Sequence, residues 1–333
     1  MTNENKKLMG QVQILLRKHG QKAFKIAKNS VLQEKNVYET VYEALRYFME
    51  ESWFDLQHPA LISLACQAVG GEPEKTLRIG AAMVLLAGAA DIHDDIIDKS
   101  RFKNSKPTVF GKFGKEIALL AGDALLFKGL ILLHNACETF PEKTRATIIK
   151  ITKEAFFGIG GATAKERKFK GKYDLKPKEY FNIIEAKAAI AEACVKIGAI
   201  IGRGKPKEVN ALGNYGRTLG ILMALRDDFI DLFEPDELRN RAKNEILPLP
   251  LLYVFKDANK KNEILPLIRK KRITEQEIQA LVDLVMKTKE VKKLKEDMQT
   301  SIERGEKELS KIIRKNTNKY PFRLLLQSTI EDL

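Results

Sequence analysis

The chain of 333 residues carries 58 Lys and Arg against 44 Asp and Glu, a formal net charge of +14, and 44% of it is hydrophobic. That apolar share is enough for a large core, and the 3 scattered cysteines exclude a disulfide framework or a zinc-ligand pattern, which favours a reducing cytoplasm. No nucleic-acid-binding motif accompanies the charge, so we expect no nucleic acid as a partner, although a basic surface also suits contact with an anionic membrane.

The first residues lack the apolar run of a signal peptide, and no stretch of about 20 uninterrupted apolar residues occurs. We therefore expect no segment that crosses a membrane. No Ser/Gly-rich or Pro-rich run divides the chain into compositional halves, so we expect one domain over residues 1–333.

Nearly all of the chain is predicted to be helical, because apolar residues recur at the i, i+3, i+4 spacing of one helix face. In chain order the predicted segments are Tyr38–Met49, Leu77–Ile97, Ile117–Ala136, Arg145–Phe157, Tyr180–Ile201, Val209–Phe233, Ile273–Met286 and Met298–Ile313. Glycine and proline clusters between them, including Gly158 to Gly161, are predicted to break the helices. The pattern predicts an all-α bundle of about ten or more helices.

An aspartate cluster lies in the second of these segments. Asp94 and Asp98 share one helix face, since residues four apart are neighbours on a helix, and Asp95 lies at the edge of that face. Apolar residues precede the cluster, so an acidic stripe facing solvent is the less favoured interpretation. Carboxylates in such a setting are expected to be paired or to bind metal.

A second cluster of the same form, Asp227, Asp228 and Asp231, lies in the predicted helix Val209–Phe233 and also follows apolar residues. If the two clusters face each other, they form a cage of hard oxygen ligands. Such a cage suits Mg²⁺, which prefers carboxylates together with substrate phosphates.

These motifs resemble the trans-polyprenyl diphosphate synthase family, of the class I isoprenoid synthase fold. The resemblance rests on His93-Asp94-Asp95-Ile-Ile-Asp98, Pro107-Thr108, Gly122-Asp123, Lys187 and Gly220…Arg226-Asp227-Asp228-Phe-Ile-Asp231, in the family's order. It implies helices around a deep apolar cavity that excludes water. It also implies a homodimer, or a subunit of one of the family's heteromeric synthases.

The implied activity is a transferase reaction of isoprenoid biosynthesis. Three Mg²⁺ ions would bridge an allylic prenyl diphosphate to the aspartates, the allylic cation would form, and isopentenyl diphosphate would attack it to give a longer prenyl chain. The resemblance assigns the metal to Asp94, Asp95, Asp98, Asp227 and Asp231, places Asp228 beside them, and gives Lys187 and Lys243 contacts to diphosphate.

The chain departs from the family where isopentenyl diphosphate binds. The family has Gly-Gly-Lys-Arg-x-Arg-Pro there, and the residues at the Lys and Arg positions are Asp55, Leu56 and His58. No Lys or Arg lies between Arg46 and Lys75, so a shifted alignment does not restore them. Diphosphate recognition relies on charge-assisted contacts, and their loss would weaken ordinary binding of isopentenyl diphosphate.

Three hypotheses therefore stay open. The first is an elongating synthase whose second diphosphate site is rebuilt from Lys103, Arg101, Lys106 and the basic stretch 165–172. The second is an enzyme that ionises the allylic diphosphate and uses no second diphosphate, such as a terpene cyclase, a lyase or a synthase with another acceptor. The third is a non-elongating partner subunit of a heteromeric synthase.

Cavity depth is predicted from the residues before the first cluster. In the family the prenyl tail runs past these turns, and Ala89 and Ala90 stand one turn before Asp94. Two alanines leave the floor open, whereas an aromatic side chain would close it. Because each helical turn adds about 5.4 Å, we expect room for a chain of about C20 or longer.

Overall fold

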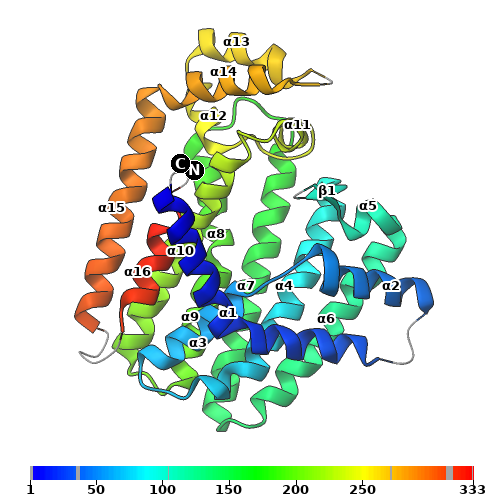
Figure 1. The fold of residues 1–333 in the computed structure, drawn as a ribbon, viewed down its shortest axis with the longest axis vertical. Helices are drawn as coiled ribbons and strands as arrows, with labels where there is room; N and C mark the ends of the chain where they lie inside the picture. Colours follow the sequence, from blue (N-terminus) through cyan, green and yellow to red (C-terminus); the bar gives the residue numbers. More distant parts are fainter. Residues whose placement is uncertain (1–2, 35–37, 104, 271, 313–317, 332) are drawn as a thin grey trace.

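The fold is all-α, as expected, with the helices gathered into one bundle (Figure 1). The structure, a computed structural model, describes residues 3–34, 38–103, 105–270, 272–312, 318–331 and 333. Within these residues the α-helices are α1 (Asn3–Leu32), α2 (Glu39–Tyr47), α3 (Gln57–Ala68), α4 (Leu77–Asp98), α5 (Val109–Phe113), α6 (Lys115–Cys137), α7 (Glu142–Phe169), α8 (Pro177–Lys187), α9 (Ala189–Ile201), α10 (Pro206–Ile230), α11 (Pro235–Asn244), α12 (Leu249–Val254), α13 (Ala258–Ile268), α14 (Glu275–Met286), α15 (Lys289–Ile312) and α16 (Tyr320–Gln327).

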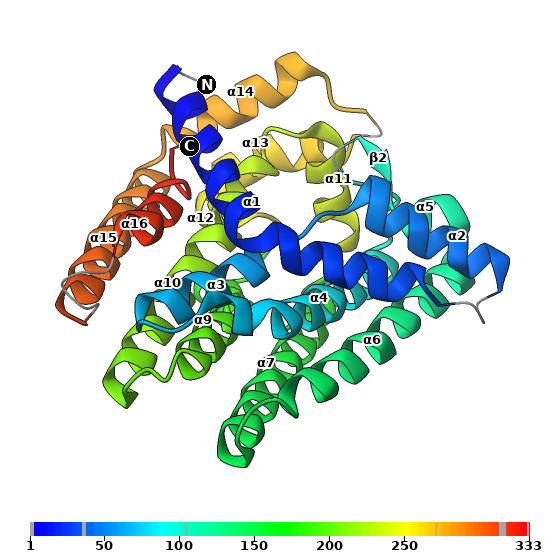
Figure 2. The same cartoon turned by 60° about the horizontal axis from the view of Figure 1, so that its bottom comes forward.

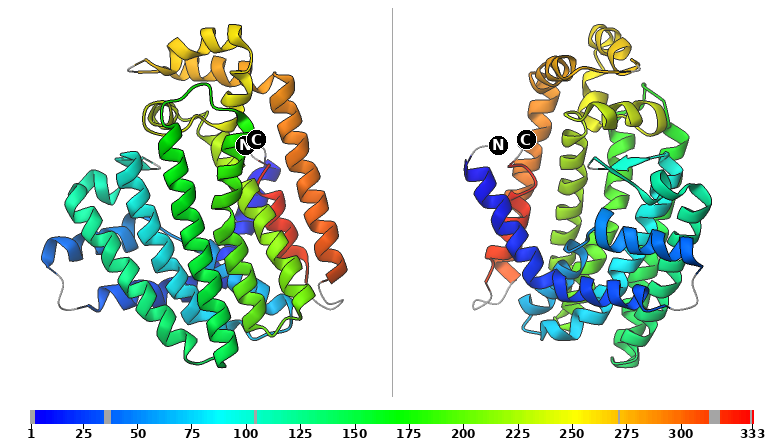
Figure 3. Two further views of the ribbon diagram at one scale, coloured as in Figure 1. Left: turned by 180° about the vertical axis from the view of Figure 1, so that it is seen from behind. Right: turned by 45° about the vertical axis from the view of Figure 1, so that its right-hand side comes forward.

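The centre of the bundle consists of long helices that pack side by side. α4 packs along α6, and α9 packs against α3, α7 and α10. α15 and α16 cover α10 on one side. α1 runs from α16 across α3 and α4, and α2 and α5 pack against α6 (Figures 1 and 2). α11, α13 and α14 lie across the end at which α4 and α10 finish (Figures 1 and 3). Both aspartate clusters are therefore at the same end of the molecule, beneath the layer that contains α11.

The end of α4 is fixed by its own sequence. Lys99 adopts a left-handed conformation with φ 59°, and the N–H of Ser100 donates to the carbonyl of Asp95, a common way to end a helix. The Thr108 hydroxyl then donates to the carbonyl of Ser100 at 2.7 Å and accepts from Gly111 N–H at 2.9 Å as the cap of α5. Between them lies a short hairpin of two strands, β1 (Phe102–Lys103) and β2 (Lys106–Pro107). The hairpin folds back over the first cluster.

At two points the helices are interrupted differently from the sequence prediction. The expected helix Tyr180–Ile201 is two helices, which meet at Ala188 just after Lys187. A Cβ on Gly220 of α10 would lie 3.0 Å from Cα of Ala188, so the backbones approach closely at this junction. The glycines 158–161 do not break a helix, because α7 runs through them, and an added Cβ on Gly158, Gly160 or Gly161 would meet no atom within 4 Å. Packing of α7 against α8 and α9 outweighs the weak helix propensity of glycine.

Two helices qualify as membrane spans by length and composition, although the sequence predicted none. They are Pro73–Asp98, which includes α4, and α6. In the first, 67% of the most apolar window is buried inside the protein, as expected of a core helix. In α6 only 33% is buried, so a large apolar surface of this helix faces outward. The predicted end of the last segment, Ile313, lies outside the described residues.

Candidate functional site

An apolar cavity of about 620 Å³ opens beside the first aspartate cluster. Its walls come from α4, α7 and α9, and its polar groups come from α3, α4, α7 and α8. The lining residues are His58, Ala87, Ala90, Asp91, His93, Asp94, Ile97, Phe156, Ile159, Gly160, Thr163, Ala164, Arg167, Lys187 and Ile190. The structure thus brings Asp94, Lys187 and Ala90 together around one cavity. Gly160 of α7 faces it too, and the absence of a side chain there keeps it wide.

Asp94 and Asp98 lie one helical turn apart at the end of α4, in an environment rich in negative charge. Burial, Asp94, Glu245 and Glu166 together raise the pKa of Asp98 to about 8, and Lys187 only partly opposes them. Burial is the largest cause, and the three carboxylates add to it. Glu166 and Glu245, from α7 and the residue after α11, were not identified from the sequence.

Asp95 has a different environment from Asp94, because it is 3% exposed and lies under the hairpin. Its Oδ1 lies 2.7 Å from Nζ of Lys103, in an ion pair that lacks the alignment of a directed hydrogen bond. Lys103 also donates to Asp91 at 3.0 Å. Burial raises the pKa of Asp95 to about 7 in spite of Lys103. Lys103, predicted to bind substrate, therefore pairs with carboxylates of α4.

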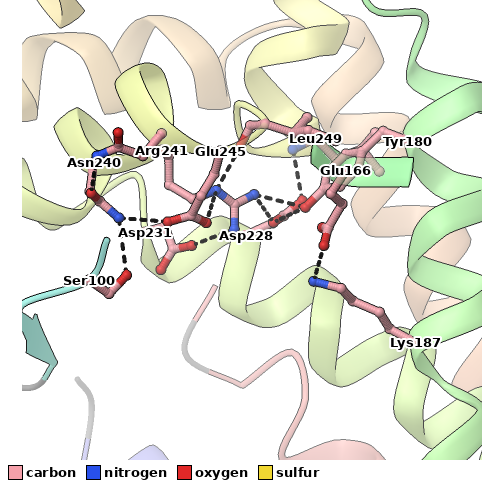
Figure 4. Close-up of polar contacts among 12 residues, drawn as sticks. Ser100, Glu166, Tyr180, Lys187, Asp228, Asp231, Asn240, Arg241, Glu245 and Leu249 are labelled. Carbon is pink, nitrogen blue, oxygen red and sulfur yellow. Dashed lines mark hydrogen bonds and ion pairs between the residues drawn. The ribbon is translucent and has the colours of Figure 1, made fainter. Parts of the chain in front are cut away.

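In the second cluster, too, some aspartates are accessible to a ligand and one is buried. Asp227 and Asp231 are exposed enough to meet a ligand but lie in a poorly solvated region. Burial raises the pKa of Asp227 to about 6 and that of Asp231 to about 8. Arg226 and Arg241 oppose the shift of Asp227, Arg241 opposes that of Asp231, and nearby carboxylates add to both shifts. Asp228, in contrast, is 2% exposed. Its Oδ1 accepts from the Tyr180 hydroxyl at 2.9 Å, and its Oδ2 accepts from Leu249 N–H at 2.8 Å (Figure 4).

Arg241 of α11 is the central cation of this cluster, and sequence reasoning missed it (Figure 4). Its guanidinium donates to Asp228 at 2.7 Å and to Asp231 at 3.1 Å, and also to the Tyr180 hydroxyl at 2.8 Å. The side chain of Arg241 is 12% exposed. Lys243, which was predicted to contact diphosphate, is exposed and lies two residues further along the same helix. The useful signal in the sequence was an Arg one helical turn before the buried segment Ile246–Leu249.

Lys243 lines a different pocket, of about 910 Å³, on the outer side of α11. The cations around this pocket are Lys99, Arg101, Arg239, Lys243, Arg269 and Lys270, against the carboxylates Asp236 and Glu237. None of the aspartates of the two clusters lines it. Ser100 and Asn240 line it as well, and the amide of Asn240 donates to the Ser100 hydroxyl at 3.3 Å (Figure 4). The basic pocket is larger than the apolar cavity, but the apolar cavity is the one next to Asp94.

Lys187 ends α8 and lines the cavity, with its Nζ 2.6 Å from Oε2 of Glu166 (Figure 4). Burial alone would lower the pKa of Lys187, but Glu166 and Asp94 outweigh burial and raise it. Lys187 is therefore charged, and it lies between Glu166 of α7 and Asp94 of the first cluster. Arg167, one residue after Glu166, lines the same cavity and donates to the carbonyl of Ile97 at 3.3 Å. It is a second cation that the sequence analysis did not single out.

The two alanines before the first cluster lie in different places. Ala90 lines the cavity, and so does Ala87 one turn earlier. Ala89 is 1% exposed and packs in a cluster of apolar residues between α1, α2, α4 and α6, away from the cavity wall. Only one of the two predicted floor positions is thus in contact with the cavity.

The start of α3 carries the residues that replace the family's basic motif. Asp55 is 7% exposed, and its Oδ1 accepts the N–H groups of Gln57 and His58 at 3.0 and 3.1 Å. Its Oδ2 lies 2.7 Å from Nδ1 of His58. Burial would lower the pKa of His58, but the charge and hydrogen bond of Asp55 outweigh burial and raise it. Asp55 therefore both caps α3 and fixes the His58 ring at the cavity wall.

The donor set fits a hard divalent cation such as Mg²⁺. Asp98 and Asp231 are poorly solvated carboxylates with raised pKa values, and a bound cation would stabilise their charged forms. Among the described residues, however, no three His, Cys, Asp or Glu side chains already form a group that could hold a metal ion. Oxygen atoms of a bound diphosphate would have to complete the coordination, which is usual for Mg²⁺.

Comparison with known proteins agrees with this geometry. Residues 40–285 match the family model described as polyprenyl synthetase. The chain is 28% identical over 256 residues to a geranylgeranyl diphosphate synthase of Sulfolobus acidocaldarius, covering 74% of this chain and 77% of that protein. It is 32% identical over 181 residues to a short chain isoprenyl diphosphate synthase of Methanothermobacter thermautotrophicus, covering 54% of each.

Among solved structures, the geranylgeranyl pyrophosphate synthetase from Pyrococcus horikoshii superposes with a TM-score of 0.82 at 22% identity, over 98% of this chain and 99% of that one. The enzyme of the same name from Geoglobus acetivorans gives 0.81 at 20% identity, over 95% and 99%. These likenesses confirm the fold. Because the family model spans most of its length, the chain belongs to the polyprenyl synthetase family and is a prenyl-transferring enzyme.

Proposed function

We propose that the protein ionises an allylic prenyl diphosphate in a Mg²⁺-dependent reaction and condenses it with isopentenyl diphosphate to give a longer prenyl diphosphate. The observation that carries this proposal is the meeting of Asp94 and Lys187 at one apolar cavity, with the second cluster at the same end of the bundle. Membership of the family and the likeness to geranylgeranyl diphosphate synthases support it.

The side chains would divide the work as follows. Asp94, Asp98, Asp227 and Asp231 would hold the magnesium, which when bound stabilises the charge on the departing diphosphate. Lys187 and Arg167 bind that diphosphate from the cavity wall. Ala87, Ala90, Ile190 and Phe156 surround the prenyl tail and keep water from the cation.

Asp95 and Asp228 act mainly by holding the site together. Asp95 pairs with Lys103 and so anchors the hairpin over α4. Asp228 joins α8, α10 and α11 through Tyr180 and Arg241 (Figure 4). A network of this kind, fully hydrogen-bonded and buried, orients the neighbouring ligands Asp227 and Asp231.

For the diphosphate of isopentenyl diphosphate, we propose the basic pocket beside Ser100 in place of the absent cations of α3. It concentrates Lys and Arg side chains, among them Lys243 and Arg101, and the Asn240–Ser100 hydrogen bond links it to the end of α4. Lys243→Glu should then raise the KM for isopentenyl diphosphate and leave that for the allylic substrate unchanged. Equal KM values for isopentenyl diphosphate in wild type and variant would show that this pocket does not bind it.

Transfer to another acceptor is a second candidate function. The start of α3 holds a carboxylate and a histidine where a diphosphate would need cations, and this favours an acceptor without one. A non-catalytic subunit is less well supported, since the carboxylates of both clusters are kept in a costly, poorly solvated environment. The three free, buried cysteines fit a reducing compartment such as the cytoplasm.

The deciding experiment incubates the pure protein with Mg²⁺ and C10, C15 or C20 allylic diphosphates, each with and without isopentenyl diphosphate. Longer prenyl diphosphates that require isopentenyl diphosphate support elongation. Products formed equally well without it support the second candidate. No turnover of any substrate contradicts both.

We also propose that the protein is a homodimer through α6. Leu119, Leu120, Phe127, Leu130 and Ile131 are 46–69% exposed. At 100° per residue these five positions fall on one face of the helix. Such a stripe on both copies would be self-complementary, as a two-fold interface requires. Asp123 lies in the same stripe and is 3.3 Å from Nε2 of His93, so the face adjoins the first aspartate cluster.

A further inference from the structure

The pair Asp55–His58 has the geometry of a proton acceptor held in place by a carboxylate. A carboxylate oxygen can only accept, so at 2.7 Å from Oδ2 of Asp55 the Nδ1 of His58 carries the proton. In the neutral ring this leaves the lone pair on Nε2. In the described part of the chain Nε2 has no protein partner, and His58 lines the cavity. The group that His58 offers to a cavity ligand is therefore Nε2.

The surroundings of His58 keep the ring in this orientation. Asp55 is fixed by two backbone N–H groups of α3 as well as by the ring, so three hydrogen bonds hold one buried carboxylate. The side chain of His58 is 21% exposed and lines the cavity, so a cavity ligand can reach it. A base oriented by a third group in this way is the arrangement used to activate a hydroxyl group in many unrelated enzymes.

The charge at this end of the cavity disfavours an anionic acceptor. Asp55 and His58 together carry a net charge of −1 with the ring neutral and zero with the ring protonated. The other charged or titratable groups of the cavity lie on α4, α7 and α8: Asp91, His93, Asp94, Arg167 and Lys187. On α1, which packs against α3, the facing titratable group is His19, and it is bonded to Ser63 at 3.1 Å. Arg167 and Lys187 are beside the first cluster, where the allylic diphosphate is proposed to bind.

From this geometry we propose a further activity of the same site: transfer of the prenyl group to a neutral hydroxyl acceptor, with His58 as the general base and Asp55 as its positioning residue. The proposal rests on the proposed ionisation of an allylic diphosphate, but it does not require isopentenyl diphosphate.

The step balances without a further reagent. The bond between C1 of the prenyl group and the diphosphate oxygen breaks, and its electron pair leaves with the diphosphate. A lone pair of the acceptor oxygen forms the new C1–O bond, and the hydroxyl proton passes to Nε2 of His58. Asp55 stabilises the imidazolium until the proton is released to water. The products are diphosphate, a proton and a prenyl ether, or a prenyl alcohol when the acceptor is water.

The test uses the full chain with Mg²⁺, geranylgeranyl diphosphate and no isopentenyl diphosphate, in water and in water with glycerol. Prenyl alcohol and glyceryl ether are measured by mass spectrometry, so that the two sources of hydroxyl are told apart. His58→Asn retains an amide N–H near the position of Nδ1, which keeps the contact to Asp55, but removes the base. We expect it to lower hydroxyl transfer by about 10²–10⁴-fold, the usual contribution of a general base.

Two further variants separate a chemical role from a structural one. His58→Ala should regain part of the lost rate when imidazole is added, which a merely structural role would not show. The rate of hydroxyl transfer in wild type should rise with pH as His58 loses its proton, and this dependence should be absent in His58→Asn. Lys293→Gln, at an exposed side chain of α15, is the control and should behave as wild type.

Each outcome bears on the proposal. Hydroxyl products in wild type that fall in His58→Asn and return with imidazole support it. Unchanged hydroxyl transfer in His58→Asn overturns it, and so does the absence of hydroxyl products from a wild-type protein that elongates with isopentenyl diphosphate. If wild type releases no diphosphate under either condition, the proposed ionisation fails, and the general-base role fails with it.

Discussion

Lys187 and Glu166 form an ion pair of 2.6 Å at the wall of the apolar cavity. The cation that is proposed to bind the allylic diphosphate is thus engaged by a carboxylate of α7. Substrate binding must then break one charge-assisted contact to make another. The affinity of the site depends on the difference between the two contacts, and so Glu166 influences substrate affinity without touching the substrate.

Glu166→Gln should therefore lower the KM for the allylic diphosphate, by up to about tenfold, which corresponds to about 1.4 kcal/mol. The free energy of unfolding should change little, because Lys187 loses a partner while a carboxylate whose pKa is raised by burial is removed. Initial-rate kinetics and thermal unfolding measure the two effects. Glu154→Gln, on the exposed side of the same helix, is the control. A higher KM in Glu166→Gln would mean that Glu166 assists the substrate or its metal.

The metal assignment makes a second prediction. Asp94→Asn and Asp227→Asn should each lower diphosphate release by about 10²–10³-fold, as expected when one preorganised electrostatic group is removed. Both variants should remain folded, since each removes a carboxylate from a poorly solvated, negatively charged region. The rise in melting temperature on addition of Mg²⁺ and diphosphate should shrink as well. Asp297→Asn, on the exposed face of α15, is the control. Near-normal turnover at saturating Mg²⁺ would remove these residues from the metal site.

How far the sequence predicted the site can be judged from single residues. The all-α fold and the helices with the two clusters followed from apolar periodicity and from motif spacing, which are local properties. Arg241 and Glu166 could not be found in this way, because their partners are 10 to 21 residues away or on another helix. Asp95 and Asp228 repeat the motif's letters, yet their burial under the hairpin and against Tyr180 depends on tertiary packing.

The cavity floor gives a graded prediction of product length. Ala90 and Ala87 line the cavity about one and two turns before Asp94, so a Phe at either position would block it at depths that differ by about 4.5 Å. Ala90→Phe should shorten the longest accepted or formed prenyl chain more than Ala87→Phe does. Chromatography of the products from C10, C15 and C20 substrates measures the series. An identical product distribution in both variants would place the floor elsewhere.

Ala89→Phe should behave differently from its neighbour. Ala89 is 1% exposed in the apolar cluster of α1, α2 and α6, and adding an aromatic ring to a packed core costs about 1–3 kcal/mol or more. We therefore expect a loss of thermal stability without a stepwise change in chain length. A shortened product from a stable Ala89→Phe protein would show that the cavity extends behind α4.

The Asp55–His58 pair predicts a pH-dependent contribution to stability. Because Asp55 raises the pKa of His58 above its usual value, the pair stabilises the folded state fully below about pH 6.5, and this stabilisation is lost as the pH rises through the raised pKa. Asp55→Asn keeps a good helix cap but removes the charge. It should therefore lower the melting temperature more at about pH 5.5 than at about pH 8.5.

The matched control for this experiment is Asp257→Asn. Asp257 caps α13 through Asn259 and Lys260 as Asp55 caps α3, but it is exposed and has no histidine partner. Its effect on the melting temperature should be small and nearly independent of pH over this range. If Asp55→Asn shows no greater loss at the lower pH, the ring of His58 is not charged in the folded protein at that pH.

The outward face of α6 predicts the oligomeric state. Phe127 and Leu130 are 69% and 49% exposed, near the middle of the apolar stripe. A glutamate at either position would be buried without a partner charge, once from each copy, in a two-fold interface. Phe127→Glu or Leu130→Glu should therefore convert a dimer into a monomer. Sedimentation velocity of wild type and variants measures this. Ile14→Glu, at a side chain of α1 that is 68% exposed, should leave the dimer intact.

Loss of the dimer should also change the binding of the allylic diphosphate at the first cluster. His93, the residue before Asp94, lies against α6 so closely that a Cβ on Gly122 would be 2.5 Å from its Nε2, and Asp123 in the stripe lies 3.3 Å from the same nitrogen. A rearranged α6 would therefore shift the end of α4 and the first cluster with it. We expect the monomeric variants to show a higher KM for the allylic diphosphate while their helical content stays unchanged. A wild-type protein that is monomeric at all concentrations would refute the interface, and a monomeric variant with unaltered kinetics would show that α6 does not support the first cluster.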